Sequence, residues 1–205
     1  ITAQDVKYAE DLGFRIKHLG IARRAEHGIE LRVHPTLIPE EQLIANVNGV
    51  KNAVLVQAHA VGPTLYYGAG AGAGPTASAV VADIVDIVRD ISYTEDGAGT
   101  IPQLAFEALT DLPILKREEM TTGYYLRVDA EDQTGVLADI TTILSRAGIS
   151  IDAIMQQSRL KDLIPIVILT DPVVESKMDD AIAKIQALPA IHGEIVRIRL
   201  ESLDS

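Results

Sequence analysis

The stretch YYLRVDAEDQTGVLADITTILSRAG, residues 124–148, changes from one hydrophobic pattern to another within a few positions. Its first part is a short, mostly apolar run, which is typical of a strand. Its second part carries apolar residues at i, i+1, i+4, i+7, i+8 and i+11, the spacing of an amphipathic helix. These positions are Val136, Leu137, Ile140, Ile143, Leu144 and Ala147. The stretch predicts a strand and then a helix that ends at Gly148.

The same alternation of strands and helices continues to the end of the chain. It predicts strands over residues 150–157 and 163–169 with a polar turn between them at 159–162, a helix over 178–188 that Pro189 stops, and a last strand over 194–200. The order strand-helix-strand-strand-helix-strand is that of a ferredoxin-like domain. Such a domain leaves one face and the edges of its sheet to be covered, which is why it often pairs with another copy.

The first half of the chain predicts a different arrangement. Two alternating strands, residues 14–21 and 29–34, look like neighbours in one sheet. The other expected elements are a first helix capped by Thr2 with Val6, Ala9 and Leu12 on one face, a short helix after Pro39, strands over 53–56 and 64–67, and a long helix up to about Asp90. Residues 91–120 are expected to be a linker with a helical piece at 104–109.

The loop GAGAGAGPT, residues 68–76, lies between the last of these strands and the long helix. Glycines allow the backbone to approach a phosphate or a ribose closely, and free N–H groups at a helix start favour an anion. The same spacing also fits a tight connection with no ligand, and the residues alone leave both interpretations open. The loop is not the usual GxGxxG fingerprint, and it lacks the Lys-Ser/Thr ending of a P-loop.

Composition excludes several classes of function. The net charge of −11 and the pI near 4.8 argue against nucleic acid and against an anionic membrane surface as partners. The chain has no cysteine, so disulfides, thiolate metal sites and a cysteine nucleophile are excluded. Residues 52–82 are uncharged, but their glycines and prolines are incompatible with one membrane-spanning helix. No histidine lies at metal-ligand spacing, and structural roles are expected for His18, His34 and His59.

The start of the helix at Val136 is a second candidate site. Backbone N–H groups around Asp132, Gly135, Val136 and Leu137 are placed to hold a ligand carboxylate, and Asp152 at the next strand is placed to meet an ammonium group. Together these groups are a candidate clamp for a free amino acid. The alternative is an ordinary capped helix followed by a polar strand start.

Several stretches resemble the homoserine dehydrogenases. They are KHLGIA at residues 17–22, ELRVHPTLIP at 30–39, GVKNAV at 49–54, and GAGAG with PTASAVVAD at 68–72 and 75–83. The stretches DQTGVL at 132–137 and GISI at 148–151 resemble the ACT domain at the C-terminus of many bacterial members. The resemblance spans nearly the whole chain, apart from residues 91–120.

The resemblance implies an oxidoreductase that interconverts L-aspartate 4-semialdehyde and L-homoserine with NADP or NAD, in the cytoplasm, on the way to threonine and methionine. It implies a homodimer or a higher homo-oligomer built through the sheet of residues 14–67. It places Gly72 against the nicotinamide end of the cofactor, with Gly70 and Thr76 beside it. It makes the ACT domain a sensor of an end product, with L-threonine the first expectation.

The resemblance also implies what this chain does not carry. The catalytic lysines, the acidic residues that hold the substrate and the nucleotide-binding glycine loop of the family match nothing in this sequence, so we expect no catalytic residue in this chain and a cofactor bound mainly by an N-terminal domain. The expected division is an α+β chain with a mixed-sheet catalytic and dimerisation domain at residues 1–92, a linker at 93–120 and a ferredoxin-like ACT domain at 121–205. We expect these 205 residues alone to be inactive.

Two other functions fit parts of the pattern. The chain is a candidate for an amino-acid-binding regulatory and dimerisation module without catalysis of its own, in which case the loop at residues 68–76 is only a connection. A weaker alternative is an ACT-bearing regulator of another amino-acid pathway. The stretches at residues 33–36 and 75–78 argue against it, because they resemble the dehydrogenases.

Overall fold

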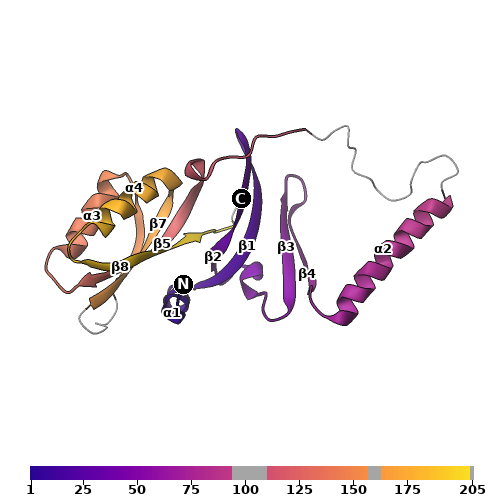
Figure 1. Ribbon diagram of the computed structural model, residues 1–205, viewed down its shortest axis with the longest axis horizontal. Coiled ribbons are helices and arrows are strands. Elements are labelled where there is room, and N and C mark those ends of the chain that lie inside the picture. The colour runs from indigo at the N-terminus through magenta and orange to yellow at the C-terminus, as the bar shows by residue number, and fades with distance from the viewer. Residues whose placement is uncertain (94–109, 157–162, 204–205) are drawn as a thin grey trace. The chain divides into compact units, whose positions relative to one another are not determined.

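The computed structural model describes residues 1–93, 110–156 and 163–203 of the chain. These residues divide into two compact units. The first unit joins the segment from Ile1 to Ala45 with the segment from Leu112 onward, and the second is the segment from Asn46 to Asp111. Each unit has its own helices and strands, most of which are labelled in Figure 1.

The first unit contains both the start and the end of the chain. Its elements are α1 (Ala3–Asp11), β1 (Phe14–Ala25), β2 (Gly28–Pro39), the short 3-10 helices η1 (Leu43–Asn46) and η3 (Arg117–Glu119), β5 (Thr121–Glu131), α3 (Val136–Arg146), β6 (Ile151–Gln156), β7 (Leu163–Val174), α4 (Glu175–Gln186) and β8 (Ile191–Leu200). Its strands form one sheet in the order β1-β2-β8-β5-β7-β6. The sheet is mixed, because β2 runs parallel to β8 while the other pairs are antiparallel.

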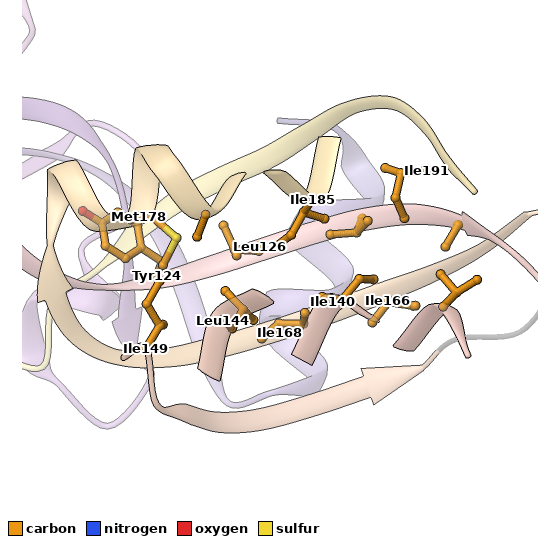
Figure 2. Packing of buried hydrophobic residues seen from close by; sticks show 14 of the residues in the cluster. Tyr124, Leu126, Ile140, Leu144, Ile149, Ile166, Ile168, Met178, Ile185 and Ile191 are labelled. Atoms are coloured by element: carbon orange, nitrogen blue, oxygen red, sulfur yellow. The ribbon is translucent and has the colours of Figure 1, made fainter. Parts of the chain in front are cut away.

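The part of this sheet from Thr121 onward is the ferredoxin-like domain that the sequence predicts. Strands β8, β5, β7 and β6 are neighbours in that order, and α3 and α4 cover one face of them (Figure 1). Side chains from both helices meet side chains from β5 and β7 in one apolar core (Figure 2). Ile140 and Leu144 of α3 and Met178 and Ile185 of α4 are completely buried there. Each such side chain contributes roughly 1.5–3 kcal/mol to stability.

The hairpin of β1 and β2 extends this sheet beyond the ferredoxin-like domain. The two strands pair in continuous register from Phe14 opposite Pro39 to Ala25 opposite Gly28, so the expected pairing of these strands is confirmed. The hairpin joins the domain through Thr36 opposite Arg199 and Leu37 opposite Leu200. The strands expected over residues 53–56 and 64–67 lie in a separate sheet, so in this chain the region 14–67 forms two sheets rather than one.

Helix α1 covers the face of the sheet opposite to α3 and α4. Tyr8 and Ala9 of α1 are buried against Leu37, Tyr125 and Val167, with several partly buried neighbours around them. The expected apolar face of this helix is wrong at Val6, which is 42% exposed. The buried side instead carries Asp5, a residue that hydrophobic periodicity cannot mark as buried. The face that such a domain commonly leaves open is therefore partly covered within the same chain.

Asp5 is a fully buried carboxylate, and hydrogen bonds to both of its oxygens stabilise it there. Its Oδ1 accepts a hydrogen bond from Arg127 Nε at 2.6 Å and one from the Tyr125 hydroxyl at 3.1 Å. Its Oδ2 accepts the backbone N–H of Thr2 at 2.7 Å and the Thr2 hydroxyl at 2.9 Å. Burial raises the pKa of Asp5, but the hydrogen bonds from Arg127 and Thr2 outweigh it, so the pKa is lowered overall. The carboxylate is ionised and ties α1 to β5.

Glu175 is the corresponding buried carboxylate on the other face. It is the first residue of α4, and its Oε2 accepts hydrogen bonds from the Tyr124 hydroxyl at 2.7 Å and from Arg199 Nε at 2.9 Å. Arg117 Nε donates to its Oε1 at 3.1 Å, and Arg197 lies 3.4 Å from the same oxygen. Burial raises its pKa, but the bonds from Arg199 and Tyr124 outweigh it and lower the pKa to about 2. Burial and the bond to Glu175 raise the pKa of Tyr124 to about 12.

The two tyrosines explain how one strand anchors helices on both faces. Tyr124 and Tyr125 are consecutive in β5, and successive side chains of a strand point to opposite faces of its sheet. One hydroxyl therefore reaches the carboxylate at the start of α4, and the other reaches the carboxylate in the first turn of α1. A carboxylate at a helix start also interacts favourably with the helix dipole.

The chain returns to the first unit alongside β2. The Ile29 N–H donates to Pro113 O at 2.8 Å, and the Leu115 N–H donates to Ile29 O at 2.9 Å. A Cβ on Gly28 would lie 2.2 Å from the Pro113 carbonyl oxygen, so a glycine is required at this crossing. Next to it, the buried Arg32 lies 2.8 Å from Glu30 and 2.5 Å from Glu201, at angles outside the hydrogen-bond range. These ionic contacts link β2 to the end of β8.

The second unit is a hairpin followed by a long helix. Its elements are β3 (Lys51–Ala58), β4 (Gly62–Ala69) and α2 (Ala73–Tyr93), as the sequence predicts. β3 and β4 pair in antiparallel register from Lys51 opposite Ala69 to Ala58 opposite Gly62. The helix expected after Pro39 is smaller than predicted, because β2 runs to Pro39 and only η1 follows. The expected helical piece at 104–109 and the turn at 159–162 lie outside the described residues.

Candidate functional site

The glycine-rich loop connects the end of β4 with the start of α2, as its sequence predicts. β4 ends at Ala69 and α2 begins at Ala73, so residues 70–72 alone make the connection. The β3–β4 register places Asn52 opposite Gly68, directly beside the point where the chain leaves the sheet. The loop is thus framed by the end of a strand pair on one side and by a helix start on the other.

Two of the glycines have a geometry that no other residue fits without rearrangement. Gly72 has a φ of +118°, a backbone conformation that L side chains rarely adopt. Gly70 has ordinary backbone angles, but a Cβ there would lie 1.5 Å from Asn52 Nδ2 and 2.7 Å from Asn52 Cγ. Gly68 and Gly74 have no such restriction, because a Cβ at either would meet nothing within 4 Å. Two of the expected cofactor residues are therefore restricted, Gly72 by its backbone conformation and Gly70 by the Asn52 side chain, which would have to move.

The start of α2 is electrostatically open to an anion. The Thr76 N–H donates to Gly72 O at 3.1 Å, which links two of the three expected cofactor residues at the start of the helix. The first turn carries no acidic side chain, and Pro75 has no N–H to satisfy. The positive end of the helix dipole and the free N–H groups at such a start favour a negatively charged ligand. The arrangement has the chemistry to hold a phosphate-bearing ligand with its backbone.

The second candidate site is the start of α3. Gly135 precedes the helix with a φ of +99°, which again favours glycine, and its carbonyl accepts the Asp139 N–H at 2.9 Å. Val136 is buried in the core, whereas Asp132 is exposed and Leu137 is partly buried. The residue before the loop is held in place, because Glu131 Oε1 lies 2.8 Å from His192 Nε2. The helix start is therefore fixed in position relative to the strand that precedes it.

Asp152 does not lie at this helix start in the same chain. It sits in β6 between Ile151, which pairs with Thr170, and Ala153, which pairs with Leu169, so it is the extra residue of a bulge. Residues 132–137 follow Glu131, which pairs with Leu163 of β7. Leu163 and Leu169 are six residues apart along β7, which is roughly 20 Å. The structure brings residues 132–137 together and leaves Asp152 at the other end of the sheet.

Sequence reasoning missed one residue at the glycine-rich loop and the buried carboxylates of the first unit. Asn52 lies inside the family-like stretch at residues 49–54, and its contact with Gly70 depends on the β3–β4 register. Nothing in the local pattern marks Asp5 or Glu175 as buried, since both are acidic residues in a first helical turn, where exposed caps are common. The available signal was indirect, namely two arginines at 197 and 199 on one strand face.

The described residues, 1–93, 110–156 and 163–203, also carry histidine and acidic side chains away from the two helix starts. Within this part of the chain, no three histidine or acidic side chains gather closely enough to hold a metal ion. Burial lowers the pKa of His34, and its Nδ1 lies 3.0 Å from the carbonyl of Pro35 in β2. None of the helices in the same part of the chain has the length and hydrophobicity to cross a membrane.

The fold defines the class first: an α+β chain in which a ferredoxin-like domain follows a hairpin, a glycine-rich loop and a long helix. Comparison with known families then names both parts. Residues 1–85 match the homoserine dehydrogenase family, and residues 124–190 match the ACT domain. The chain belongs to the homoserine dehydrogenase family and corresponds to the C-terminal part of its members.

Curated relatives support this membership over the whole chain. A homoserine dehydrogenase of Pseudomonas aeruginosa is 55% identical over 208 residues, which cover all of this chain and 48% of the relative. One of Neisseria gonorrhoeae is 52% identical over 206 residues and is covered to 47%. The chain therefore spans about half the length of the curated relatives that it matches.

Solved structures agree with the fold. A homoserine dehydrogenase from Thiobacillus denitrificans superposes with a TM-score of 0.90 at 58% identity, over all of this chain and 46% of that one. A homoserine dehydrogenase of S. aureus superposes with a TM-score of 0.63 at 24% identity, which supports the fold alone. The expected α+β class with a C-terminal ACT domain is confirmed.

Proposed function

We propose that the protein containing this chain interconverts L-aspartate 4-semialdehyde and L-homoserine with NADP or NAD, in the cytoplasm, on the path to threonine and methionine. Membership of the homoserine dehydrogenase family supports the activity. The observation that carries the proposal is the glycine-rich loop, in which Gly72 has a φ of +118° and leads directly into the start of α2. A loop of that shape at a helix start suits a dinucleotide.

The residues present fit a dinucleotide in three respects. Gly70 has no side chain, so the Asn52 amide can lie beside the loop. Gly72 turns the backbone into α2. The first turn of α2 has no acidic group that would repel a phosphate. We assign Gly70, Gly72 and Thr76 to the cofactor. The dinucleotide supplies hydride transfer when bound, while these residues orient it and keep it in place. Catalytic residues lie outside this chain in the proposal.

Exposed apolar surface on the second unit is consistent with a chain that works as part of something larger. Six apolar side chains of α2 are more than half exposed, far more than a free surface helix usually carries. They are Val80, Val81, Ile84, Ile87, Val88 and Ile91. We propose that residues 1–92 belong to the catalytic and dimerisation region, with 93–120 as linker and 121–205 as the ACT domain, and that the whole protein is a homodimer or higher homo-oligomer.

The full-length protein should oxidise L-homoserine with NADP or NAD, whereas residues 1–205 alone should give no turnover. The reason is that, in this proposal, the chain supplies the glycine-rich loop that contacts the cofactor but no residue that transfers a proton at the substrate. The measurement is steady-state formation of reduced nucleotide at 340 nm by both samples. A steady rate from the pure 205-residue chain, or none from the full-length protein with either nucleotide, would contradict the proposal.

We further propose that the ACT domain binds an amino-acid effector, with L-threonine first to be tested, at Asp132, Gly135, Val136, Leu137 and Asp152. Within one chain Asp152 is roughly 20 Å from the other four residues. β6 is the edge strand of the sheet, so it has an open side. Antiparallel pairing of β6 with β6 of a second copy would bring each Asp152 to the end where the partner's α3 begins. An effector clamp shared by two copies therefore reconciles the five residues.

Asp152→Ala in the full-length enzyme should remove any effect of threonine on the rate, because the ammonium group would lose the carboxylate proposed to contact it. The measurement is the rate of homoserine oxidation against threonine concentration. Asp180→Ala provides the control, since Asp180 is an exposed acidic residue on α4 outside the proposed clamp. An unchanged threonine response in the Asp152 variant would refute its assignment.

A further inference from the structure

Asn52 contacts the glycine-rich loop from the neighbouring strand β3. Asn52 lies in β3 opposite Gly68, and its side chain turns toward the loop that follows. The Nδ2 atom lies 1.5 Å from the place where a Cβ on Gly70 would be, and Cβ of Asn52 lies 3.3 Å from it. The amide therefore occupies the space that a side chain at position 70 would fill.

The chemistry of Asn52 is not explained by packing. Asn52 is exposed, and its side-chain amide has no hydrogen-bond partner among the described residues. An amide group carries two donors and an acceptor, which a residue chosen only to fill space does not need. Its neighbour Lys51 is engaged elsewhere, because Lys51 Nζ lies 5.8 Å from the centre of the Tyr67 ring. Asn52 thus brings unused, uncharged hydrogen-bonding groups to the edge of the loop.

We propose that Asn52 is a further dinucleotide-positioning residue, whose side-chain amide hydrogen-bonds a neutral polar group of the cofactor while its bulk fixes the path of Gly70. The partner group is a ribose hydroxyl or the carboxamide, since both can donate and accept. An uncharged amide suits these groups, and the backbone N–H groups at the start of α2 are left for the phosphates. The inference rests on the proposed function, which supplies the cofactor.

The test measures binding of NADPH and of NADH to the full-length protein by fluorescence titration, together with the midpoint of thermal unfolding. Asn52→Ala removes the bulk and the amide, whereas Asn52→Asp keeps the shape and removes the donors. Asn52→Ala should bind the preferred nucleotide roughly tenfold more weakly, the usual effect of losing one hydrogen bond to a neutral group. Asn52→Asp should do the same where the amide is the donor, whereas a ribose hydroxyl that donates would keep its bond to the carboxylate. The unfolding midpoint should stay unchanged, because the amide has no partner among the described residues.

A second pair of variants separates hydrogen bonding from space filling. Gly70→Ala should weaken binding in the presence of Asn52, because the new Cβ collides with the amide. The double variant Asn52→Ala with Gly70→Ala relieves that collision but should bind no better than Asn52→Ala alone. Gln57→Ala is the matched control, since Gln57 is an exposed amide at the far end of the same strand, opposite Pro63, and should bind as the wild type does.

The outcomes are distinguishable from those of the proposed function. Wild-type affinity in both Asn52 variants, or wild-type affinity in the double variant, would overturn the role of Asn52 while leaving the proposed function intact. A lowered unfolding midpoint in Asn52→Asp would assign the residue a structural role instead. A wild-type full-length protein that binds neither nucleotide would refute the proposed function itself.

Discussion

Glu175→Gln should lower the free energy of unfolding by about 3 kcal/mol at pH 7, which is a typical cost of removing one partner of a buried ion pair. Glu175 is completely buried and contacts Arg117, Arg197, Arg199 and the Tyr124 hydroxyl. A glutamine keeps the shape but leaves the positive charges without their common counter-ion. The arginines are partly exposed, so water limits the loss. Urea unfolding of the 205-residue chain at pH 7 measures the difference.

The Glu175 carboxylate also makes the stability difference between wild type and Glu175→Gln depend on pH. The pKa of Glu175 is about 2 in the folded chain and ordinarily 4.5. A carboxyl whose pKa is lowered by folding stabilises the folded state above its unfolded value, and that contribution is lost as the pH falls toward the folded value. The gap between wild type and Glu175→Gln should therefore be full above pH 4.5 and should narrow steadily below it.

Asp180→Asn is the matched control for this prediction. Asp180 lies on the same helix but is exposed, so its replacement should change the free energy of unfolding by less than about 0.5 kcal/mol. Equal stability of wild type and Glu175→Gln at pH 7 would contradict the interpretation of Glu175 as an anchor of α4. So would a gap that stays constant from pH 7 down to pH 3.

The parts of the fold that the sequence predicts are those governed by local periodicity. The apolar positions of α3 follow the helical repeat, and the structure buries Val136, Ile140 and Leu144 as that repeat requires. The junction of the hairpin with the ferredoxin-like domain has no local signal. It depends on Thr36 meeting Arg199, two residues far apart in the chain, and on a parallel pairing only two residues long. Long-range pairings of this kind are decided by packing rather than by pattern.

The candidate site likewise has features that the sequence predicts and features that depend on long-range contacts. The need for glycine at position 72 could be anticipated from the loop sequence, because a strand that turns sharply into a helix often requires a positive φ. The need for glycine at position 70 could not, because it comes from Asn52 on another strand. The five expected effector residues show the converse case. Spacing suggested one clamp, while the strand directions separate Asp152 from the rest within a chain.

Helix α1 illustrates why a polar residue can occupy the buried face of a helix in place of an apolar one. Periodicity assigned Val6 to the inner face, yet Val6 is exposed and Asp5 is completely buried. The buried position is stabilised because Arg127, Tyr125 and Thr2 all donate hydrogen bonds to the Asp5 carboxylate. Partners for a buried charge lie on other elements, so sequence alone gives no reason to place Asp5 inside.

Asp5→Asn should lower the free energy of unfolding by about 3 kcal/mol and should release α1 from the sheet before the rest of the unit unfolds. Arg127 is nearly buried and would keep only Asp129, whose Oδ2 lies 2.7 Å from Arg127 Nη1 and is itself partly exposed. Hydrogen exchange should therefore speed up first in residues 3–11 and around Tyr125. Urea unfolding gives the size of the effect, and exchange followed by mass spectrometry gives its location.

Two further variants make this prediction specific to the buried pair. Asp11→Asn replaces an exposed acidic residue of the same helix and should leave both stability and exchange unchanged. Adding Arg127→Met to Asp5→Asn removes the guanidinium that Asp5 no longer neutralises and should recover part of the lost stability, because replacing both partners of a buried ion pair is often nearly neutral. Faster exchange spread evenly over the whole sheet, or no recovery in the double variant, would mean that Asp5 does not anchor α1 through Arg127. A local release with recovery would show that Asp5 and Arg127 together hold α1 on β5.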